Sequence, residues 1–272
     1  MPIQSESCAM RTAAFPGRAC TLVAIIAGGL CFSLLTAGFA STQATAETAT
    51  VSSTRQSSPL ALYAGAPTAP LAETQSLTSH RSADFLTEPA SNSAREVADW
   101  VVDSGDNRGM PFVIVDKRDA RVFVFDNEGQ LRGAAPALLG LALGDDSVAG
   151  IGNRKLSSIR PKERTTPAGR FVAALGHDLG KQDILWVDYA AAISLHRVIT
   201  TNPKERRLQR LATASRLDKR ISYGCINVPA KFYETVVIPA FTGTNGVVYI
   251  LPDTKSIREV FPAYDLWKHS LL

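Results

Sequence analysis

The sequence has few cysteines and lacks several features that would assign it to a class at once. Four cysteines occur in 272 residues, and three of them lie within the first 31 positions. Neither His-x-x-x-His nor Cys-x-x-Cys spacing occurs, so we expect no metal site and no cofactor. The net charge of +4 is too small for a nucleic-acid-binding protein. No internal repeat is visible.

The first 46 residues are typical of an export signal. Arg11 and Arg18 precede an apolar run over residues 21–40, and residues 44–46 offer small side chains for cleavage. An uncleaved anchor is the alternative, because the run approaches the roughly 20 residues that span a bilayer. We favour cleavage, since three glycines weaken a helix there. Either way the bulk of the chain is expected in the periplasm or cell envelope, with membrane contact only through this segment.

Residues 47–93 are rich in Ser, Thr, Ala and Pro and show no sustained apolar periodicity. Such a stretch cannot bury enough surface to offset its ordering entropy, so we expect a flexible linker. The folded domain is therefore predicted over residues 94–272, beginning with a short amphipathic helix near residue 94.

The predicted domain is mainly β, of the β-rich α+β class, with curved mixed sheets forming a sandwich or barrel-like fold and a few inserted helices. Residues 111–115 and 121–125 are apolar runs separated by a polar turn, which predicts a hairpin. Other predicted strands cover residues 169–175, 184–187, 190–196 and 246–251. Helices are predicted at residues 203–215, 229–239 and 254–260.

Cys225 is the only cysteine that remains once the predicted signal is removed. A solitary thiol in an exported protein favours nucleophilic catalysis, while a small buried apolar side chain is the structural alternative. Cys225 follows Gly224 and shortly precedes Pro229, which can open a helix. A turn of this kind can set the sulfur beside backbone N–H groups that would stabilise a thiolate and an oxyanion.

Three ordered motifs resemble the catalytic domain of the L,D-transpeptidases. The family's signature is Ser-His-Gly-Cys followed by an apolar residue and Asn or Arg, and residues 222–227 are Ser-Tyr-Gly-Cys-Ile-Asn. Residues 166–171, Thr-Pro-Ala-Gly-Arg-Phe, are similar to the family's Thr-Pro-x-Gly-x-Phe segment. His196 ends an apolar strand, as the family's histidine does. The resemblance covers roughly residues 111–252.

The resemblance implies a cysteine acyltransferase that cross-links peptidoglycan stem peptides. A thiol with an ordinary pKa of about 8.5 needs a base at neutral pH, and His196 would supply it to Cys225. The thiolate would attack the L,D peptide bond of a stem tetrapeptide, D-alanine would leave, and an amine of a second stem would resolve the thioester. A carboxypeptidase or endopeptidase that hydrolyses the same thioester is one alternative. A non-catalytic wall-binding protein is another.

The other predicted site residues follow from the same motifs. An oxyanion hole is expected from backbone N–H groups, and neighbouring side chains are expected to bind substrate. The oxyanion donors are those of Tyr223, Gly224 and Cys225, and the substrate-binding residues are Ser222, Asn227 and Arg220. The group that orients His196 stays open among Asp183, Asp188, Asp218 and a backbone carbonyl.

Two features depart from the family's pattern. Tyr223 stands where the signature has a histidine, so His196 must be the base. The segment 197–220 is longer than usual and carries eight basic and two acidic residues, a net charge of +6. Asn202 is a predicted helix cap within it. The segment could be a basic lid or funnel for carboxylate-rich stem peptides, or an ordinary solvated charged face.

Overall fold

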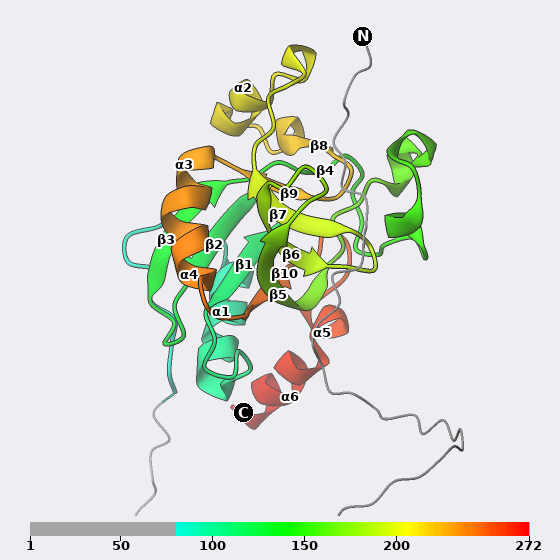
Figure 1. The fold of residues 1–272 in the computed structure, drawn as a ribbon. Coiled ribbons are helices and arrows are strands. Elements are labelled where there is room, and N and C mark those ends of the chain that lie inside the picture. The colour runs from blue at the N-terminus through cyan, green and yellow to red at the C-terminus, as the bar shows by residue number, and fades with distance from the viewer. Residues whose placement is uncertain (1–79, 272) are drawn as a thin grey trace, which may run out of the picture. The chain divides into compact units, whose positions relative to one another are not determined.

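The computed structural model describes residues 80–271. The predicted export signal and the first part of the predicted linker lie outside these residues. Ten strands occur in the described part, eight of them in one mixed sheet with the order β3-β2-β1-β10-β5-β6-β7-β9 (Figure 1). The strands are β1 (Phe112–Asp116), β2 (Arg121–Phe125), β3 (Leu131–Pro136), β4 (Leu139–Gly140), β5 (Gly169–His177), β6 (Asp183–Asp188), β7 (Ile193–Arg197), β8 (Arg220–Ser222), β9 (Ile226–Val228) and β10 (Gly246–Ile250).

The two ends of the large sheet come together. Leu138, two residues beyond β3, exchanges backbone hydrogen bonds of 2.8 and 2.9 Å with Asn227 of β9. The short strands β4 and β8 then pair in parallel next to this bridge. The sheet is thus curved and mostly closed, which confirms the predicted β-rich, barrel-like fold class. The predicted hairpin over residues 111–125 is also confirmed, since β1 and β2 pair antiparallel.

Alternation along the central strands divides the apolar side chains between two cores. In β1, Val113 and Val115 face the inside of the curved sheet, whereas Phe112 and Ile114 face the helices outside. Strands β2 and β10 follow the same pattern, with valine and isoleucine inside and mostly aromatic rings outside. Because both faces are covered, these strands read as continuous apolar runs in the sequence.

Helices cover the outer core and one edge of the sheet. Helix α1 (Asn92–Ser104) begins at the cap Ser91, whose hydroxyl accepts a hydrogen bond from the Ala94 N–H at 3.1 Å. Its Trp100 packs edge-on against Tyr249 of β10 at 5.7 Å between ring centroids. The other helical segments are α2 (Arg207–Ala212), α3 (Ala230–Phe232), a π-helical stretch (Tyr233–Val237), α4 (Ile238–Phe241), α5 (Ile257–Val260) and α6 (Pro262–Ser270).

The predicted helix over residues 203–215 is interrupted. Asn202 does cap a turn, because its side chain accepts from the Lys204 N–H at 3.2 Å. That turn is a 3₁₀ helix, Pro203–Glu205, and it ends at Arg206, whose φ of +52° is left-handed. Helix α2 starts only after this residue. Three further short 3₁₀ turns, Ile151–Asn153, Leu156–Ser158 and Pro161–Glu163, occupy the long connection from β4 to β5, and a fourth, Leu217–Lys219, precedes β8.

The folded part begins earlier than the predicted boundary at residue 94. Asp84 exchanges backbone hydrogen bonds with Gly129 and Leu131 at 2.9 and 3.0 Å. Phe85 is only 2% exposed and packs edge-on against Phe123 and Phe125. A single buried aromatic residue within a polar stretch gives no periodic signal, so the sequence does not indicate that residues 84 and 85 of the predicted linker pack onto the domain.

Replacement of Phe85 should therefore destabilise the fold. We expect Phe85→Ala to lower the free energy of unfolding by about 3–5 kcal/mol, because a fully packed ring leaves a cavity. The neighbouring Leu86→Ala is the matched control, since Leu86 is 66% exposed. Urea unfolding followed by far-UV circular dichroism measures both. Equal stability of the two variants would contradict the packing of Phe85 and would support the assignment of residues 80–93 to a flexible linker.

Candidate functional site

The parallel pairing of β7 with β9 brings the predicted base and the predicted nucleophile to neighbouring strands. His196 lies opposite Asn227 in the register, and Cys225 immediately precedes β9. Alternate residues of a strand share a face, so His196 and Ser194 point to the same side of β7. The Ser194 hydroxyl donates to the Cys225 sulfur at 3.6 Å. The structure thus brings His196 and Cys225 to the same side of the sheet.

A backbone carbonyl orients His196. Its Nδ1 lies 2.7 Å from the carbonyl oxygen of Arg197, and because a carbonyl can only accept, Nδ1 must carry the hydrogen. Nε2 is then the acceptor atom of the neutral ring. Among the candidates left open by the sequence, the carbonyl therefore fills this role, while Asp183 pairs with the Arg197 guanidinium at 3.1 Å.

Asn227 connects the base, the thiol turn and an arginine from the basic segment. Its Nδ2 lies 3.4 Å from Nε2 of His196 and donates to the Cys225 carbonyl at 3.3 Å. Its Oδ1 accepts from Nη1 of Arg207 at 2.6 Å. The guanidinium therefore fixes which way the amide points, with the NH₂ group toward the histidine. The Arg207 side chain is only 2% exposed and also binds Glu205.

Arg207 was not singled out by the sequence. It is one of eight basic residues in its segment, and nothing in the local pattern distinguishes it from its exposed neighbours. Its burial becomes visible only in the folded chain, where its guanidinium reaches Asn227 of β9. The other cations of the segment mostly bind the chain itself: Arg197 pairs with Asp183 and Glu234, Arg216 with Asp119, and Lys219 donates to three carbonyl oxygens. This pattern favours a structural role for the charge over a funnel.

Gly224 gives the thiol turn its shape. Its φ is +136°, and a Cβ there would lie 2.6 Å from Cδ1 of Ile193 and 2.8 Å from the carbonyl oxygen of Thr165. No other residue fits this position without displacing backbone. The Thr166 hydroxyl donates to the Gly224 carbonyl at 2.8 Å. The Thr-Pro motif and the cysteine motif, 58 residues apart, therefore meet directly.

A cluster of four buried charged side chains supports this turn. Its members are Lys117, Asp145, Arg220 and Asp253, and together they are called the ion cluster. Lys117 Nζ donates to Asp145 Oδ1 and to the Thr166 carbonyl, both at 2.8 Å. Arg220 donates to Asp253 Oδ1 at 2.6 Å and to the Lys117 carbonyl at 2.9 Å. All four charged side chains are at most 8% exposed. The cluster links β1 and the segment after β10 to both motifs of the site.

The three predicted substrate-binding side chains have internal roles. Ser222 donates to the Cys225 carbonyl at 2.6 Å and accepts from the Gly224 N–H at 3.1 Å. Asn227 is fully buried, and Arg220 belongs to the ion cluster. In the structure these side chains therefore support the turn, and their contact with substrate stays a prediction. Among the predicted oxyanion donors, the Gly224 N–H is engaged by Ser222.

The Cys225 thiol is covered by the segment from Ser147 to Ile159, which is called the covering segment. Cys225 is 8% exposed and lines a cavity of about 20 Å³, which holds about one water molecule. One wall is formed by the segment from Ser147 to Ile159, and the other by Thr165, residues 191–193 and Tyr223. Tyr223, which replaces the family's histidine, lies under the Arg164 guanidinium at 4.0 Å from the ring centroid.

Within residues 80–271, no three His, Cys, Asp or Glu side chains are grouped so that they could hold a metal ion. No helix in this range is long and apolar enough to cross a bilayer.

Comparison with known proteins finds structural similarity at low sequence identity. No protein-family model matches the sequence, and no curated protein matches it significantly. Among solved structures, the chain is similar to the helical cell shape determining protein Pgp2 from Campylobacter jejuni, at 16% identity and a TM-score of 0.37, over 60% of this chain and 56% of that one. It is also similar to the L,D-transpeptidase from Xylanimonas cellulosilytica, at 13% identity and a TM-score of 0.32, over 52% of this chain and 60% of that one.

A third similar structure is the catalytic domain of the L,D-transpeptidase from E. faecium, at 15% identity and a TM-score of 0.29, over 52% of this chain and 95% of that domain. The chain thus spans little more than half the length of the first two structures. The second and third of these structures are L,D-transpeptidases.

Removal of the Asp145 charge should lower the stability of the fold and make that stability less dependent on pH. Burial alone would raise the pKa of Asp145, but hydrogen bonds from Lys117, Thr254 and backbone N–H groups outweigh it and hold the pKa well below its ordinary value. The stability from this group is complete above the unfolded pKa of about 3.9 and is lost as pH falls toward the folded value. We expect Asp145→Asn to cost about 3–5 kcal/mol at pH 7, because the buried Lys117 loses its nearest carboxylate and keeps only the more distant Asp253, at 3.5 Å.

Urea unfolding at pH 7 and pH 3 measures both effects of Asp145→Asn, with a smaller difference between the two pH values expected in the variant. Asp146→Asn is the control, since that side chain is 77% exposed and should change stability by no more than about 0.5 kcal/mol. An Asp145→Asn protein as stable as this control would contradict the role of the ion cluster.

Loss of the Arg207 guanidinium should release Asn227. We expect Arg207→Met to slow alkylation of Cys225 by iodoacetamide and to shift the pH profile of that reaction, because the amide no longer holds His196 Nε2 in place. Lys204→Met is the matched control, since Lys204 is exposed on the same segment. Partial recovery of the profile in Arg207→Lys would support an electrostatic role. If the pH profile of alkylation in Arg207→Met equals that in Lys204→Met, Arg207 has no role at the site.

Proposed function

We propose that this protein is a cysteine acyltransferase of the L,D-transpeptidase type that acts on peptidoglycan stem peptides, with Cys225 as nucleophile and His196 as base. One observation carries the proposal: the hydrogen bond from His196 Nδ1 to the Arg197 carbonyl places the ring's lone pair on Nε2, on the side of the sheet that holds the thiol. At rest Nε2 faces the Asn227 amide at 3.4 Å, and it exchanges this contact for the thiol proton in the reaction. A histidine in this tautomer can take a proton from a thiol. The meeting of the Thr-Pro and cysteine motifs at Gly224 further supports the assignment.

In the first half of the reaction, His196 Nε2 accepts the Cys225 proton and the thiolate attacks the carbonyl of the L,D peptide bond. The new C–S bond gives a tetrahedral oxyanion, for which the backbone N–H groups of Tyr223 and Cys225 are the remaining predicted donors. Collapse of this intermediate breaks the C–N bond. The histidine returns its proton to the departing amine, so D-alanine leaves and a thioester remains.

In the second half, an amine of another stem peptide attacks the thioester. Its proton passes to His196, the C–S bond breaks, and the thiolate is protonated again. Water in place of the amine would give hydrolysis, which is the outcome of a carboxypeptidase or endopeptidase. The two activities differ only in the acceptor that reaches the acyl group.

A stem peptide can reach the sulfur only if the cover moves. The cavity of about 20 Å³ is far smaller than the 300–1,000 Å³ that small-molecule sites occupy. Ile151 and Ile159 of the covering segment are 6% and 5% exposed, so they close the cavity with apolar surface. Opening would expose this surface, and bound substrate would have to cover it again. Loop motions of this kind commonly accompany substrate binding.

The substrate also implies a location. Peptidoglycan lies outside the cytoplasmic membrane, so this function requires export, in agreement with the predicted signal over residues 1–46. The linker would then let the catalytic domain reach the wall.

Incubation of the protein with purified disaccharide tetrapeptides tests the proposal, with products analysed by mass spectrometry. Cross-linked dimers are expected from the unaltered chain. Cys225→Ala should abolish product, because residues 80–271 contain no other thiol that could form the thioester. His196→Ala should lower the rate by about 10²–10⁴-fold, the usual contribution of a general base.

His177→Ala is the matched control for the histidine, since His177 is exposed at the end of β5. Tripeptides without dimers would assign the hydrolase instead. Unchanged substrate together with retained binding to isolated walls would rule out both enzymes and leave the non-catalytic protein. Full activity of His196→Ala would exclude that residue as the base.

A further inference from the structure

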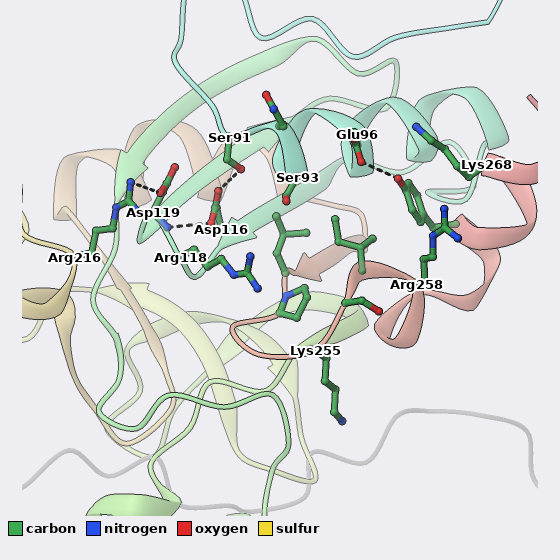
Figure 2. Close-up of a pocket in the computed structure, with 16 residues that line it drawn as sticks. Ser91, Ser93, Glu96, Asp116, Arg118, Asp119, Arg216, Lys255, Arg258 and Lys268 are labelled. Carbon is green, nitrogen blue, oxygen red and sulfur yellow. Dashed lines mark hydrogen bonds and ion pairs between the residues drawn. The ribbon is translucent and has the colours of Figure 1, made fainter.

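A second, larger cavity lies apart from the thiol. Its volume is about 660 Å³, and it lies between the start of α1, the turn from β1 to β2, and the segment after β10 that contains α5 and α6 (Figure 2). None of the residues that line it also lines the cavity at Cys225. Its size is within the range of small-molecule sites.

Basic side chains outnumber acidic ones around this cavity. Three carboxylates and five cations line it. The carboxylates are Glu96, Asp116 and Asp119, and the cations are Arg118, Arg216, Lys255, Arg258 and Lys268.

The carboxylates are already satisfied by neighbours. Asp116 accepts from the Ser91 hydroxyl at 2.6 Å and from the Asp119 N–H at 3.0 Å. Asp119 pairs with Arg216 at 3.0 Å, and Glu96 accepts from the Tyr264 hydroxyl at 2.8 Å. Only Asp119 forms an ion pair with a lining cation, and the five cations and three carboxylates together leave the lining with a net charge of +2.

Two of the cations have no carboxylate partner within residues 80–271. Arg118 donates through Nε and Nη2 to the backbone carbonyl of Asp253, at 3.2 and 3.0 Å, which leaves its charge uncompensated. The Lys268 ammonium lies 6.0 Å from the ring centroid of Trp267. Lys255 and Arg258 pair with Asp146 and Asp265, which are not among the lining residues.

We propose that this cavity binds an anionic ligand with at least two phosphate or carboxylate groups. Figure 2 shows Arg216 at one end and Arg258 with Lys268 at the other, with Arg118 between them, so cations are spread along the length of the cavity. Guanidinium groups bind phosphate and carboxylate through paired hydrogen bonds, and a ligand with separated anionic groups engages both ends at once. The site does not depend on the function proposed for Cys225.

Isothermal titration calorimetry of the full chain at low ionic strength tests the proposal. Inorganic tripolyphosphate is the probe in one arm and citrate in the other, which distinguishes phosphate from carboxylate recognition. The double variant Arg118→Gln, Lys268→Gln should bind about tenfold more weakly or worse, because each lost charge removes a charge-assisted hydrogen bond. Added salt should weaken binding to the unaltered chain.

Arg132→Gln, Lys231→Gln is the matched control, since it removes the same charge at two exposed positions outside the cavity. Its affinity should equal that of the unaltered chain. If the double variant fails to fold, Lys268→Gln alone is measured, because that side chain supports no hydrogen bond in the fold. No binding of either probe, or equal loss in test and control variants, would overturn the proposal. The Cys225→Ala protein should bind as the unaltered chain does, whatever its activity.

Discussion

The parallel pairing of β7 with β9 is the constraint on which the rest of the site depends. It sets His196 opposite Asn227 and brings Ser194 to the Cys225 sulfur, so one register fixes four side chains at once. A shift by one residue would turn His196 to the opposite face of the sheet. The bridge between Leu138 and Asn227 closes the curved sheet at the same strand and holds this register from its other side.

Buried charge surrounds the thiol turn on two sides. The ion cluster lies on one side, and it consists of Lys117, Asp145, Asp253 and Arg220. On the other side, Arg207 of the basic segment binds Asn227. Taking such groups out of water is costly unless each finds partners, so a fold that keeps them has few alternative arrangements. The long basic segment therefore contributes a positioned guanidinium to the site. Its remaining cations mostly serve the local structure.

Two cavities in the described residues differ in size and in the charge of their lining. The one at Cys225 is small, and the segment from Ser147 to Ile159 forms one of its walls, so the Cys225 side chain is buried. The other is large and lined by cations around α1, α5 and α6. By their lining residues, the Cys225 cavity lies against the inner core and the larger one against the outer core. The larger cavity is connected to the ion cluster through Arg118, which binds the carbonyl of the same Asp253 that pairs with Arg220.

The sequence by itself determined the β-rich class, most of the strands and the motif around Cys225, because these depend on short-range patterns: apolar runs, turn residues and the adjacency of Gly224 and Cys225. It placed His196 at a strand end, but not which atom of the ring accepts a proton. It also missed Phe85 and Arg207, since one buried side chain in a polar stretch leaves no periodic trace. The tautomer of His196, the internal roles of Ser222, Asn227 and Arg220, and the cover over the thiol were decided only by tertiary structure. Each of them is set by partners far along the chain, and burial is a property of the packed molecule that no local pattern contains.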